Sequence, residues 1–165
     1  MGEAKRRMET NQQLWARSRV NQLANHPDIA HELAPLYSNL DLSAFFENPA
    51  NVVLFEGNGA MLFAAVPDQP GFFDTHYLFP RAKGKANLEA ARRCVAAMFA
   101  KHGAFVLMGV TPRDNRAARF INRALGSVPK GEGIDSQGRH CIFYVLERAK
   151  WATSNDCGEL STTTL

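Results

Sequence analysis

Cysteines and long apolar runs are both scarce in this sequence of 165 residues. The three cysteines are an odd number without Cys-x-x-Cys spacing, which excludes a disulfide framework and is typical of reduced thiols. No apolar run approaches the roughly 20 residues that a membrane-spanning helix needs. The charged start, residues 1–7, has no apolar core of the kind found in secretion signals. We therefore expect a cytoplasmic protein without a membrane partner.

Histidine and net charge are limited as well. The five histidines are scattered, with no pair at metal-ligand spacing, so the sequence predicts no metal site. The net charge is only +3, and the one basic run, Lys5-Arg6-Arg7, is short. Nucleic acid is therefore the least supported partner. A binder of this class would combine that run with Lys83 and Lys85, and its binding would depend strongly on salt.

What the chain does contain is an ordinary globular composition, 45% hydrophobic and 21% charged, in a length that suits one domain. Its first third has helical periodicity. We expect a helix at residues 8–24, a second at residues 28–36 with Asp28 as its N-cap, and a short third helix at residues 42–46.

From residue 51 the pattern changes to strands. Apolar runs at residues 51–55 and 60–66 flank Glu56-Gly57-Asn58-Gly59, in which Asn-Gly predicts the tight turn of a β-hairpin. A third strand is expected at residues 72–79. The first three strands are therefore predicted to be antiparallel neighbours.

The second half alternates helices and strands. The expected elements are a helix at 86–102, a strand at 104–110, a helix from 111 to 125 and a closing strand at 139–147. The continuous apolar run at 104–110 predicts a strand that is buried on both faces. Residues 130–138 are expected to form a loose loop, and the polar tail from Ala149 is expected to lie outside the core. This order of elements predicts an α/β fold, an α+β mixed sheet with helices on its faces.

The loop that follows the third strand carries the clearest chemistry. It reads Leu78-Phe79-Pro80-Arg81-Ala82-Lys83-Gly84-Lys85-Ala86. Gly84 and Ala86 are small residues at the start of a helix, where they let a ligand approach the first unpaired N–H groups and the positive end of the helix dipole. Three basic side chains add charge: Arg81, Lys83 and Lys85. The loop is therefore a candidate pyrophosphate cradle, although a solvated turn would have the same composition.

Two segments resemble the GNAT N-acetyltransferase superfamily. Arg81-x-x-Gly84-x-Ala86 matches the Arg/Gln-x-x-Gly-x-Gly/Ala signature by which that family holds the pyrophosphate of acetyl-CoA. Asn115-x-x-Ala118-x-x-Ile121, followed by Gly126, is similar to the family's Asn-x-x-Ala-x-x-Leu-Tyr-x-x-x-Gly helix. The resemblance covers roughly residues 50–147. It implies a GNAT-like acyl-CoA N-acyltransferase fold in a domain at residues 25–148, with an N-terminal helical arm at 1–24 and a polar tail at 149–165.

The resemblance also implies roles for individual residues, with acetyl-CoA as cosubstrate. Asn115 would contact the pantetheine arm, which would enter between splayed strands. The backbone N–H groups of Tyr77, Leu78 and Phe79 would pair with that arm, and one would polarise the thioester carbonyl. A helix N-cap explains Asn115 equally well.

Three features depart from the family pattern. The family's helix-borne Tyr, which protonates the leaving thiolate, falls at Asn122, and asparagine cannot donate a proton in that way. The loop before Arg81 is about two residues shorter than usual. The N-terminal strand of the family is either missing or replaced by the helix at residues 8–24.

Catalysis would need a base for the amine and an acid for the thiolate. Candidates for the base are Glu56, Asp74 and His76, of which His76 has the ordinary pKa nearest to neutral. Tyr144 is the candidate for the missing acid. Solvated charges and sheet packing explain the same residues without catalysis. Cys141 is a weaker candidate for a nucleophile, because the sequence gives it no His–Asp partners.

Two functions therefore remain open. The first is an acetyl-CoA-dependent N-acyltransferase that acts on an unknown amine of a small molecule or protein. The alternative is a GNAT-fold structural or interaction protein without catalysis, such as a bacteriophage virion component, which would place the chain in the host cytoplasm or the virion. Either function is compatible with a homo-oligomer or a larger assembly. Four residues are expected to be either core or contact surface: Phe45, Phe46, Phe72 and Phe73.

Overall fold

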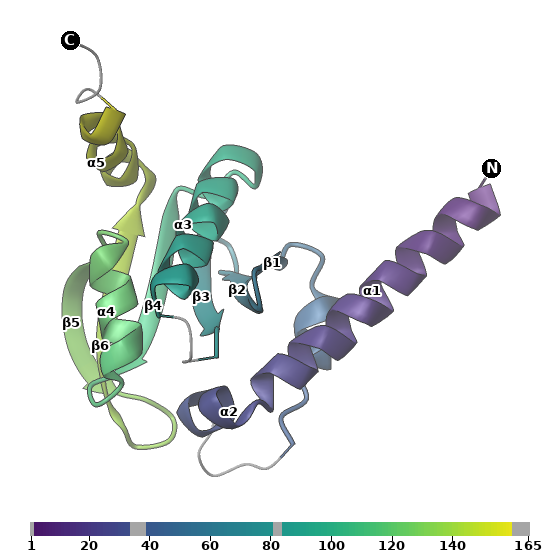
Figure 1. Cartoon of the computed structure of the whole chain (residues 1–165), viewed down its shortest axis with the longest axis horizontal. Coiled ribbons are helices and arrows are strands. Elements are labelled where there is room, and N and C mark those ends of the chain that lie inside the picture. Colours follow the sequence, from purple (N-terminus) through teal and green to yellow (C-terminus); the bar gives the residue numbers. More distant parts are fainter. Residues whose placement is uncertain (1, 34–38, 81–83, 160–165) are drawn as a thin grey trace.

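The computed structural model describes residues 2–33, 39–80 and 84–159, and one mixed sheet of six strands organises them (Figure 1). The helices are α1 (Gly2–Ala24), α2 (Pro27–Leu33), the 3-10 helix η1 (Ser43–Glu47), α3 (Gly84–Lys101), α4 (Arg116–Ala124) and α5 (Arg148–Glu159). The strands are β1 (Val52–Glu56), β2 (Gly59–Ala65), β3 (Phe72–Leu78), β4 (Val106–Pro112), β5 (Val128–Ile134) and β6 (His140–Glu147). Their order across the sheet is β1-β2-β3-β4-β6-β5. The predicted mixed sheet with helices on its faces is confirmed.

The predicted hairpin is formed by β1 and β2. Glu56 pairs with Gly59, so Gly57 and Asn58 are the two turn residues. Gly57 takes a φ of 59°, a left-handed conformation that costs glycine little. The strand β2 is buried along both faces, and it anchors the sheet between two hydrophobic cores.

The parallel pair β3–β4 separates part-way along its length. Residues 72–74 of β3 pair with residues 106–108 of β4. Beyond this point the two strands continue to Leu78 and Pro112 without pairing to each other. The Thr75 hydroxyl donates to the Met108 carbonyl at 2.7 Å, where the strands part. The splay that the resemblance implied between these strands is confirmed.

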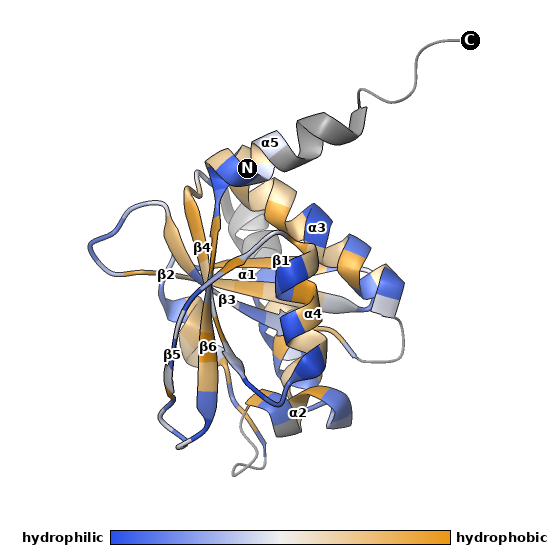
Figure 2. Cartoon of the chain, turned by 90° about the vertical axis from the view of Figure 1, so that its left-hand side faces the viewer, coloured by the Kyte–Doolittle hydropathy of each residue, from blue (hydrophilic) through white to orange (hydrophobic). Residues whose placement is uncertain are grey.

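Two cores lie on opposite faces of the sheet. The first packs α3 and α4 against one face and contains Met61, Phe63 and Met98, all fully buried. The second packs α1, α2 and η1 against the β1–β3 half of the other face, around Val20 and Leu62. Figure 2 shows hydrophobic residues along the strands and hydrophilic ones on outer helix surfaces. Burying a large apolar side chain contributes about 1.5–3 kcal/mol, so both faces contribute to stability.

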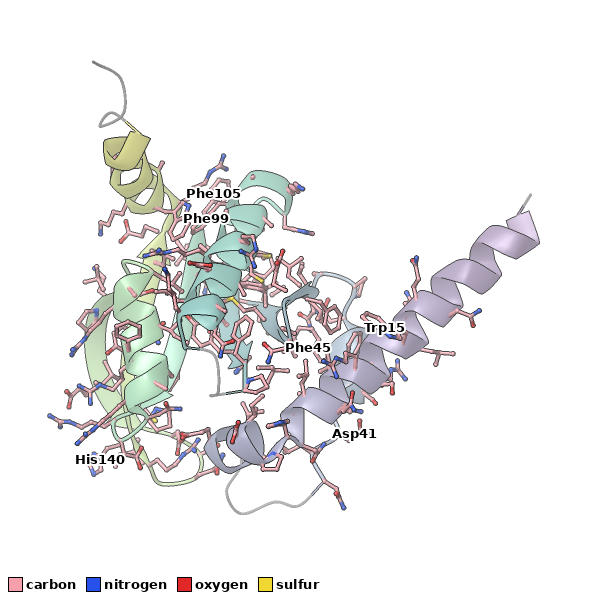
Figure 3. The ribbon with its side chains drawn as sticks, viewed as in Figure 1. Trp15, Asp41, Phe45, Phe99, Phe105 and His140 are labelled. Carbon is pink, nitrogen blue, oxygen red and sulfur yellow. The ribbon has the colours of Figure 1, made fainter. Side chains whose placement is uncertain are left out.

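The helix α1 belongs to the second core only at its C-terminal end. Leu23 is 3% exposed, whereas Leu14 and Trp15 are 56% and 58% exposed. The N-terminal part of α1 extends away from the sheet (Figure 1), and the Trp15 ring lies 5.0 Å from that of Phe55. Figure 3 labels Trp15 on α1 and Phe45 on η1, and Phe45 packs against the second core together with Phe46.

Three expectations about elements in the second half of the chain are wrong. Residues 128–134 form the edge strand β5 rather than a loose loop, because an edge strand tolerates Pro129 and a bulge before Gly131. The tail begins as the helix α5, and Trp151 packs on the first core, 6.1 Å from the Phe99 ring. The strand β4 is not buried on both faces, since Val110 is 50% exposed on the open side.

The start of α2 also differs from the prediction. Pro27 occupies the first helical position, so Asp28 lies inside the helix and is not its N-cap. The capping acceptor is the Nδ1 atom of His26, which accepts a hydrogen bond from the Asp28 N–H at 3.2 Å. The helix is described as far as Leu33, and residues 34–36 of the predicted helix lie outside the described residues.

The unequal burial of α1 predicts unequal effects of two matched substitutions. Leu23→Ala should lower the free energy of unfolding by about 2–5 kcal/mol, because it opens a cavity in the second core. Leu14→Ala, on the exposed part of the same helix, should change it by less than about 0.5 kcal/mol. Urea unfolding measures both. Equal, small effects would show that α1 is a separate arm along its whole length.

Candidate functional site

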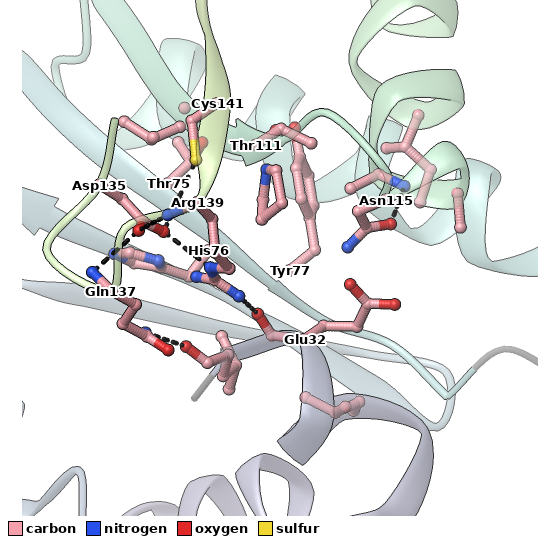
Figure 4. A pocket seen from close by; sticks show the side chains of 18 of the residues that line it. Glu32, Thr75, His76, Tyr77, Thr111, Asn115, Asp135, Gln137, Arg139 and Cys141 are labelled. Atoms are coloured by element: carbon pink, nitrogen blue, oxygen red, sulfur yellow. Dashed lines mark hydrogen bonds and ion pairs between the residues drawn. The ribbon is translucent and has the colours of Figure 1, made fainter. Parts of the chain in front are cut away.

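A cavity of about 280 Å³ opens where β3 and β4 part (Figure 4). The first residues of α4 border it on one side, and α2 with the β5–β6 turn borders it on the other. Beyond Asp74 the edge of β3 that faces β4 has no strand partner, so backbone N–H and C=O groups there are open to a ligand. The divergence of two strands therefore supplies both the space and the hydrogen-bonding edge.

His76 and Tyr77 both line this cavity, on opposite faces of the sheet. Successive side chains of a strand alternate in direction, so neighbours in sequence face opposite ways. The Tyr77 side chain packs towards the first core and α4, and Leu78 packs in the second core. His76 therefore faces the side of α1 and α2.

A polar network occupies the α4 side. Asn122 is 2% exposed, accepts a hydrogen bond from the Tyr77 hydroxyl at 3.0 Å and donates to the Thr111 hydroxyl at 3.0 Å. It also donates to the Ala118 carbonyl at 3.1 Å. Burial raises the pKa of Tyr77 above its ordinary value, so the phenol keeps its proton at neutral pH. Every polar group of the Asn122 side chain is thus engaged, and none can deliver a proton.

Asn115 combines the two roles that the sequence left open. Its Oδ1 accepts a hydrogen bond from the Ala118 N–H at 3.0 Å, which makes it the N-cap of α4. Its Nδ2 points towards the cavity in Figure 4. Capping therefore uses the oxygen and leaves the amide nitrogen on the cavity side.

The start of α3 is open to an approaching ligand. Gly84, Lys85 and Ala86 are exposed, and a Cβ built on Gly84 would meet nothing within 4 Å. The buried Asn87 donates to the Pro80 carbonyl at 2.6 Å and holds the end of β3 against the first turn of α3. Sequence analysis missed Asn87, whose only signal is a polar residue just before an apolar helix face. Two further predicted cradle residues, Arg81 and Lys83, lie outside the described residues.

The α2 side of the cavity contains His76 and the β5–β6 turn. His76 is exposed at the cavity wall, yet the protein around it displaces enough water to lower the imidazole pKa, an effect that Asp74 opposes. The neutral ring can accept a proton at pH 7.

The β5–β6 turn closes over the end of α2. Arg139 donates to the Glu32 carbonyl at 2.8 Å, and Gln137 donates to the Leu33 carbonyl at 3.1 Å. No local sequence pattern indicates these contacts.

Some of the other predicted site residues lie outside the main cavity, and the one candidate nucleophile, Cys141, has a thiol pKa that does not favour reaction. Glu56 pairs with Arg93 at 2.8 Å on β1 and does not line the cavity. Tyr144 is fully buried and lines a separate cavity of about 10 Å³ behind Asn122. Phe79 lines the main cavity. Cys141 lines it too, but burial and then Asp135 raise the pKa of its thiol, which disfavours the thiolate.

Two kinds of site find no support in the part of the chain that the structure describes. No three His, Cys, Asp or Glu side chains among those residues gather as metal ligands would. No described helix is both long and apolar enough to cross a membrane.

Solved structures similar to this chain share its architecture. Aminoglycoside acetyltransferase AAC(6')-Ib in complex with coenzyme A matches with a TM-score of 0.65 and 12% identity, over 84% of this chain and 92% of that one. An acetyltransferase of the GNAT family from Bacillus anthracis matches with a TM-score of 0.58 and 16% identity, over 79% and 87%. The chain has the GNAT acetyltransferase fold. These identities establish the fold alone.

A third similar structure is matched over a smaller share of its length. Ribosomal-protein-S5-alanine acetyltransferase from Vibrio fischeri matches the GNAT fold of this chain with a TM-score of 0.50 and 18% identity, and 55% of that protein's length is spanned. No protein-family profile and no curated protein sequence matches the chain.

The β5–β6 turn predicts a specific sensitivity to acid. Hydrogen bonds from the Arg139 backbone and side chain lower the pKa of Asp135 to about 2, from an ordinary 3.8. A lowered carboxyl pKa contributes stability that is present above about pH 4 and lost as the pH falls to about 2. Asp135→Asn should therefore lower the Tm at pH 6 and reduce the further loss of Tm on acidification, as thermal denaturation can measure.

Glu132→Gln is the matched control for Asp135→Asn. Its ion pair with Arg113, at 3.2 Å, joins two side chains that are more than half exposed, and such pairs contribute little. An equal change in acid sensitivity in both variants would contradict the role given to Asp135.

Proposed function

We propose that this protein is an acetyl-CoA-dependent N-acyltransferase. Acetyl-CoA would lie in the split between β3 and β4, and an amine would enter from the side of α1 and α2. The supporting observation is the end of β3–β4 pairing after Asp74 and Met108, which leaves an unpaired strand edge beside a cavity of about 280 Å³. That volume is close to the lower end of small-molecule sites. A protein of the same fold, AAC(6')-Ib, has been solved with coenzyme A.

The residues present fit such a ligand at three points. The exposed first turn of α3, at Gly84, offers N–H groups and the positive helix end to a pyrophosphate. Arg81 and Lys83 would add charge there, as the family resemblance implies. The Nδ2 of Asn115 and the open backbone edge of residues 77–79 face the path of a pantetheine arm.

The chemistry assigned to the chain is the removal of a proton from the amine. When bound, acetyl-CoA supplies an activated acyl group. Among the predicted bases, His76 lines the cavity on the acceptor side, and its lowered pKa keeps it neutral and able to accept the proton. Glu56 is held in its ion pair with Arg93 away from the cavity, so we assign the base to His76.

A second function is favoured by one observation. Asn122 occupies the family's tyrosine position with its amide fully engaged, which suits a GNAT fold that no longer catalyses. Such a protein would serve as a structural or interaction module, in a homo-oligomer or in an assembly such as a bacteriophage virion. The extended α1, with Leu14 and Trp15 exposed, would provide a contact surface.

Titration calorimetry with acetyl-CoA separates these functions. The wild type should bind with a Kd on the order of micromolar. Gly84→Glu should weaken binding more than about tenfold, because a carboxylate would occupy the pyrophosphate position, while a Glu at a helix N-terminus preserves folding. Gly131→Glu is the control, since a Cβ there also meets nothing within 4 Å and the site is on the distant strand β5. Absence of binding by the wild type would leave the non-catalytic function.

Two substitutions separate the capping and binding roles of Asn115. Asn115→Ala should lower stability by about 0.5–2 kcal/mol, because the Ala118 N–H loses its acceptor. Asn115→Asp should keep that stability, since Asp caps as well as Asn does. Both variants should bind acetyl-CoA more weakly by calorimetry, because both lose the Nδ2 donor. Unchanged affinity in Asn115→Asp would confine the residue to capping.

A further inference from the structure

The outer face of α4 carries a dense group of positive charges. The nine residues of this helix include Arg116, Arg119 and Arg123, and none of the nine is acidic. Because they are three and four positions apart, these arginines lie side by side on one face of the helix. Phe120 lies on the same face and is 61% exposed, and Arg116 and Arg123 are exposed as well. The outer face of α4 is thus cationic around an exposed aromatic ring.

A fourth arginine reaches the same surface from α3. Nη2 of Arg92 donates to the Ala124 carbonyl at 3.3 Å, which places its guanidinium at the C-terminal end of α4. The arginine surface is defined here by five residues: Arg92, Arg116, Arg119, Phe120 and Arg123. None of the five lines the main cavity, to which α4 contributes Ala117, Ala118 and Ile121. The arginine surface is therefore separate from the main cavity.

This arrangement of charges costs stability. Like charges three or four positions apart on a helix repel each other, and Arg116 lies in the first turn, where the positive end of the helix dipole disfavours a cation. Neither Arg116 nor Arg123 forms a salt bridge with another described residue. Nη1 of Arg119 donates to the Arg113 carbonyl at 2.7 Å rather than to a carboxylate. The described part of the chain leaves these charges unbalanced, which favours an anionic partner.

We infer that the arginine surface binds single-stranded nucleic acid. Guanidinium groups form paired hydrogen bonds with phosphate oxygens, and an exposed aromatic ring offers a face on which a base can stack. Arg116 and Arg123 lie about 10 Å apart along the helix axis, with Phe120 between them. A strand that follows α4 would therefore place phosphates at the arginines and a base on Phe120. An acidic protein segment would match the charges but would leave the exposed ring without a role.

The fold creates this surface, and no continuous run of the sequence does. Arg92 is far from the α4 arginines in the sequence, and other residues separate the arginines within α4. Nucleic acid was the least supported partner in the sequence for this reason, since the basic run considered there, Lys5-Arg6-Arg7, is short. The inference goes beyond the proposed function and does not depend on it, because the arginine surface and the main cavity share no residue.

Fluorescence anisotropy with labelled oligonucleotides tests this inference. The probes are single strands of RNA and of DNA, about 20 nucleotides long, and a DNA duplex of the same sequence. The single strands should bind with a Kd on the order of micromolar at about 50 mM salt. The logarithm of affinity should fall against that of salt concentration with a slope of about −3, since each of four arginines contributes about 0.7. The duplex should bind more weakly, because its bases are already stacked on one another.

Two variants separate the contribution of charge from that of stacking. Arg116→Ala combined with Arg123→Ala should reduce the salt slope to about −1.5, because two phosphate contacts are lost. Phe120→Ala should weaken binding about 5- to 150-fold and leave the slope unchanged. The control, Arg19→Ala combined with Lys101→Ala, removes the same charge from α1 and from the last turn of α3, and it should leave slope and affinity close to those of the wild type. All these side chains lie on helices, where alanine preserves folding.

Four results would overturn the inference. The first is the absence of binding to both single strands, and the second is an equal loss of salt slope in the control, which would show attraction by net charge alone. The third is binding of polyglutamate as tightly as the oligonucleotides, with no effect of Phe120→Ala, which would assign the surface to an acidic protein. The fourth is loss of acetyl-CoA binding in the arginine variant, measured by calorimetry, which would assign these arginines to the cofactor. A wild type that binds the strands but not acetyl-CoA would remove the proposed function and support this inference.

Discussion

The separation of β3 from β4 is the constraint on which the rest of the site depends. Parallel strands normally continue to pair along their length, and an unpaired backbone edge inside a protein is costly. Here the hydroxyl of Thr75 satisfies the Met108 carbonyl at the point of separation. Further along, Tyr77, Asn122 and Thr111 join the diverging strands through α4. Polar side chains thus hold the strands apart at a fixed distance.

The same separation organises the two faces of the sheet. The α3–α4 face has a continuous apolar core, and Asn115 borders the split from that side. The opposite face is covered by α1 and α2 only over the β1–β3 half. Contacts from the β5–β6 turn to the Glu32 and Leu33 carbonyls close the remaining gap. A ligand in the split would therefore be reached from two chemically different sides.

Much of this arrangement could be predicted from the sequence, because the spacing of the apolar residues and the residues at the turns indicate it. The hairpin, β3 and the helices α3 and α4 follow from apolar spacing and glycine positions. The strand β5 could not be predicted, because Pro129 is unusual in a strand and β5 is stabilised by its pairing with β6 rather than by its own sequence pattern. The helix α5 was not predicted because its composition is polar, and Trp151 packs it against the first core. The Arg139 contact depends on α2, a segment more than 100 residues away, and no local pattern records it.

Backbone hydrogen exchange, with and without acetyl-CoA, tests the central claim most directly. Residues 75–78 of β3 have an edge facing the split without a strand partner, and the first N–H groups of α3 have no partner within the helix. The account predicts that saturating acetyl-CoA slows exchange in both segments, while the distant strand β5 is unchanged. Unaltered exchange at residues 75–78, or protection confined to another surface, would contradict the claim that the split between β3 and β4 is the binding site.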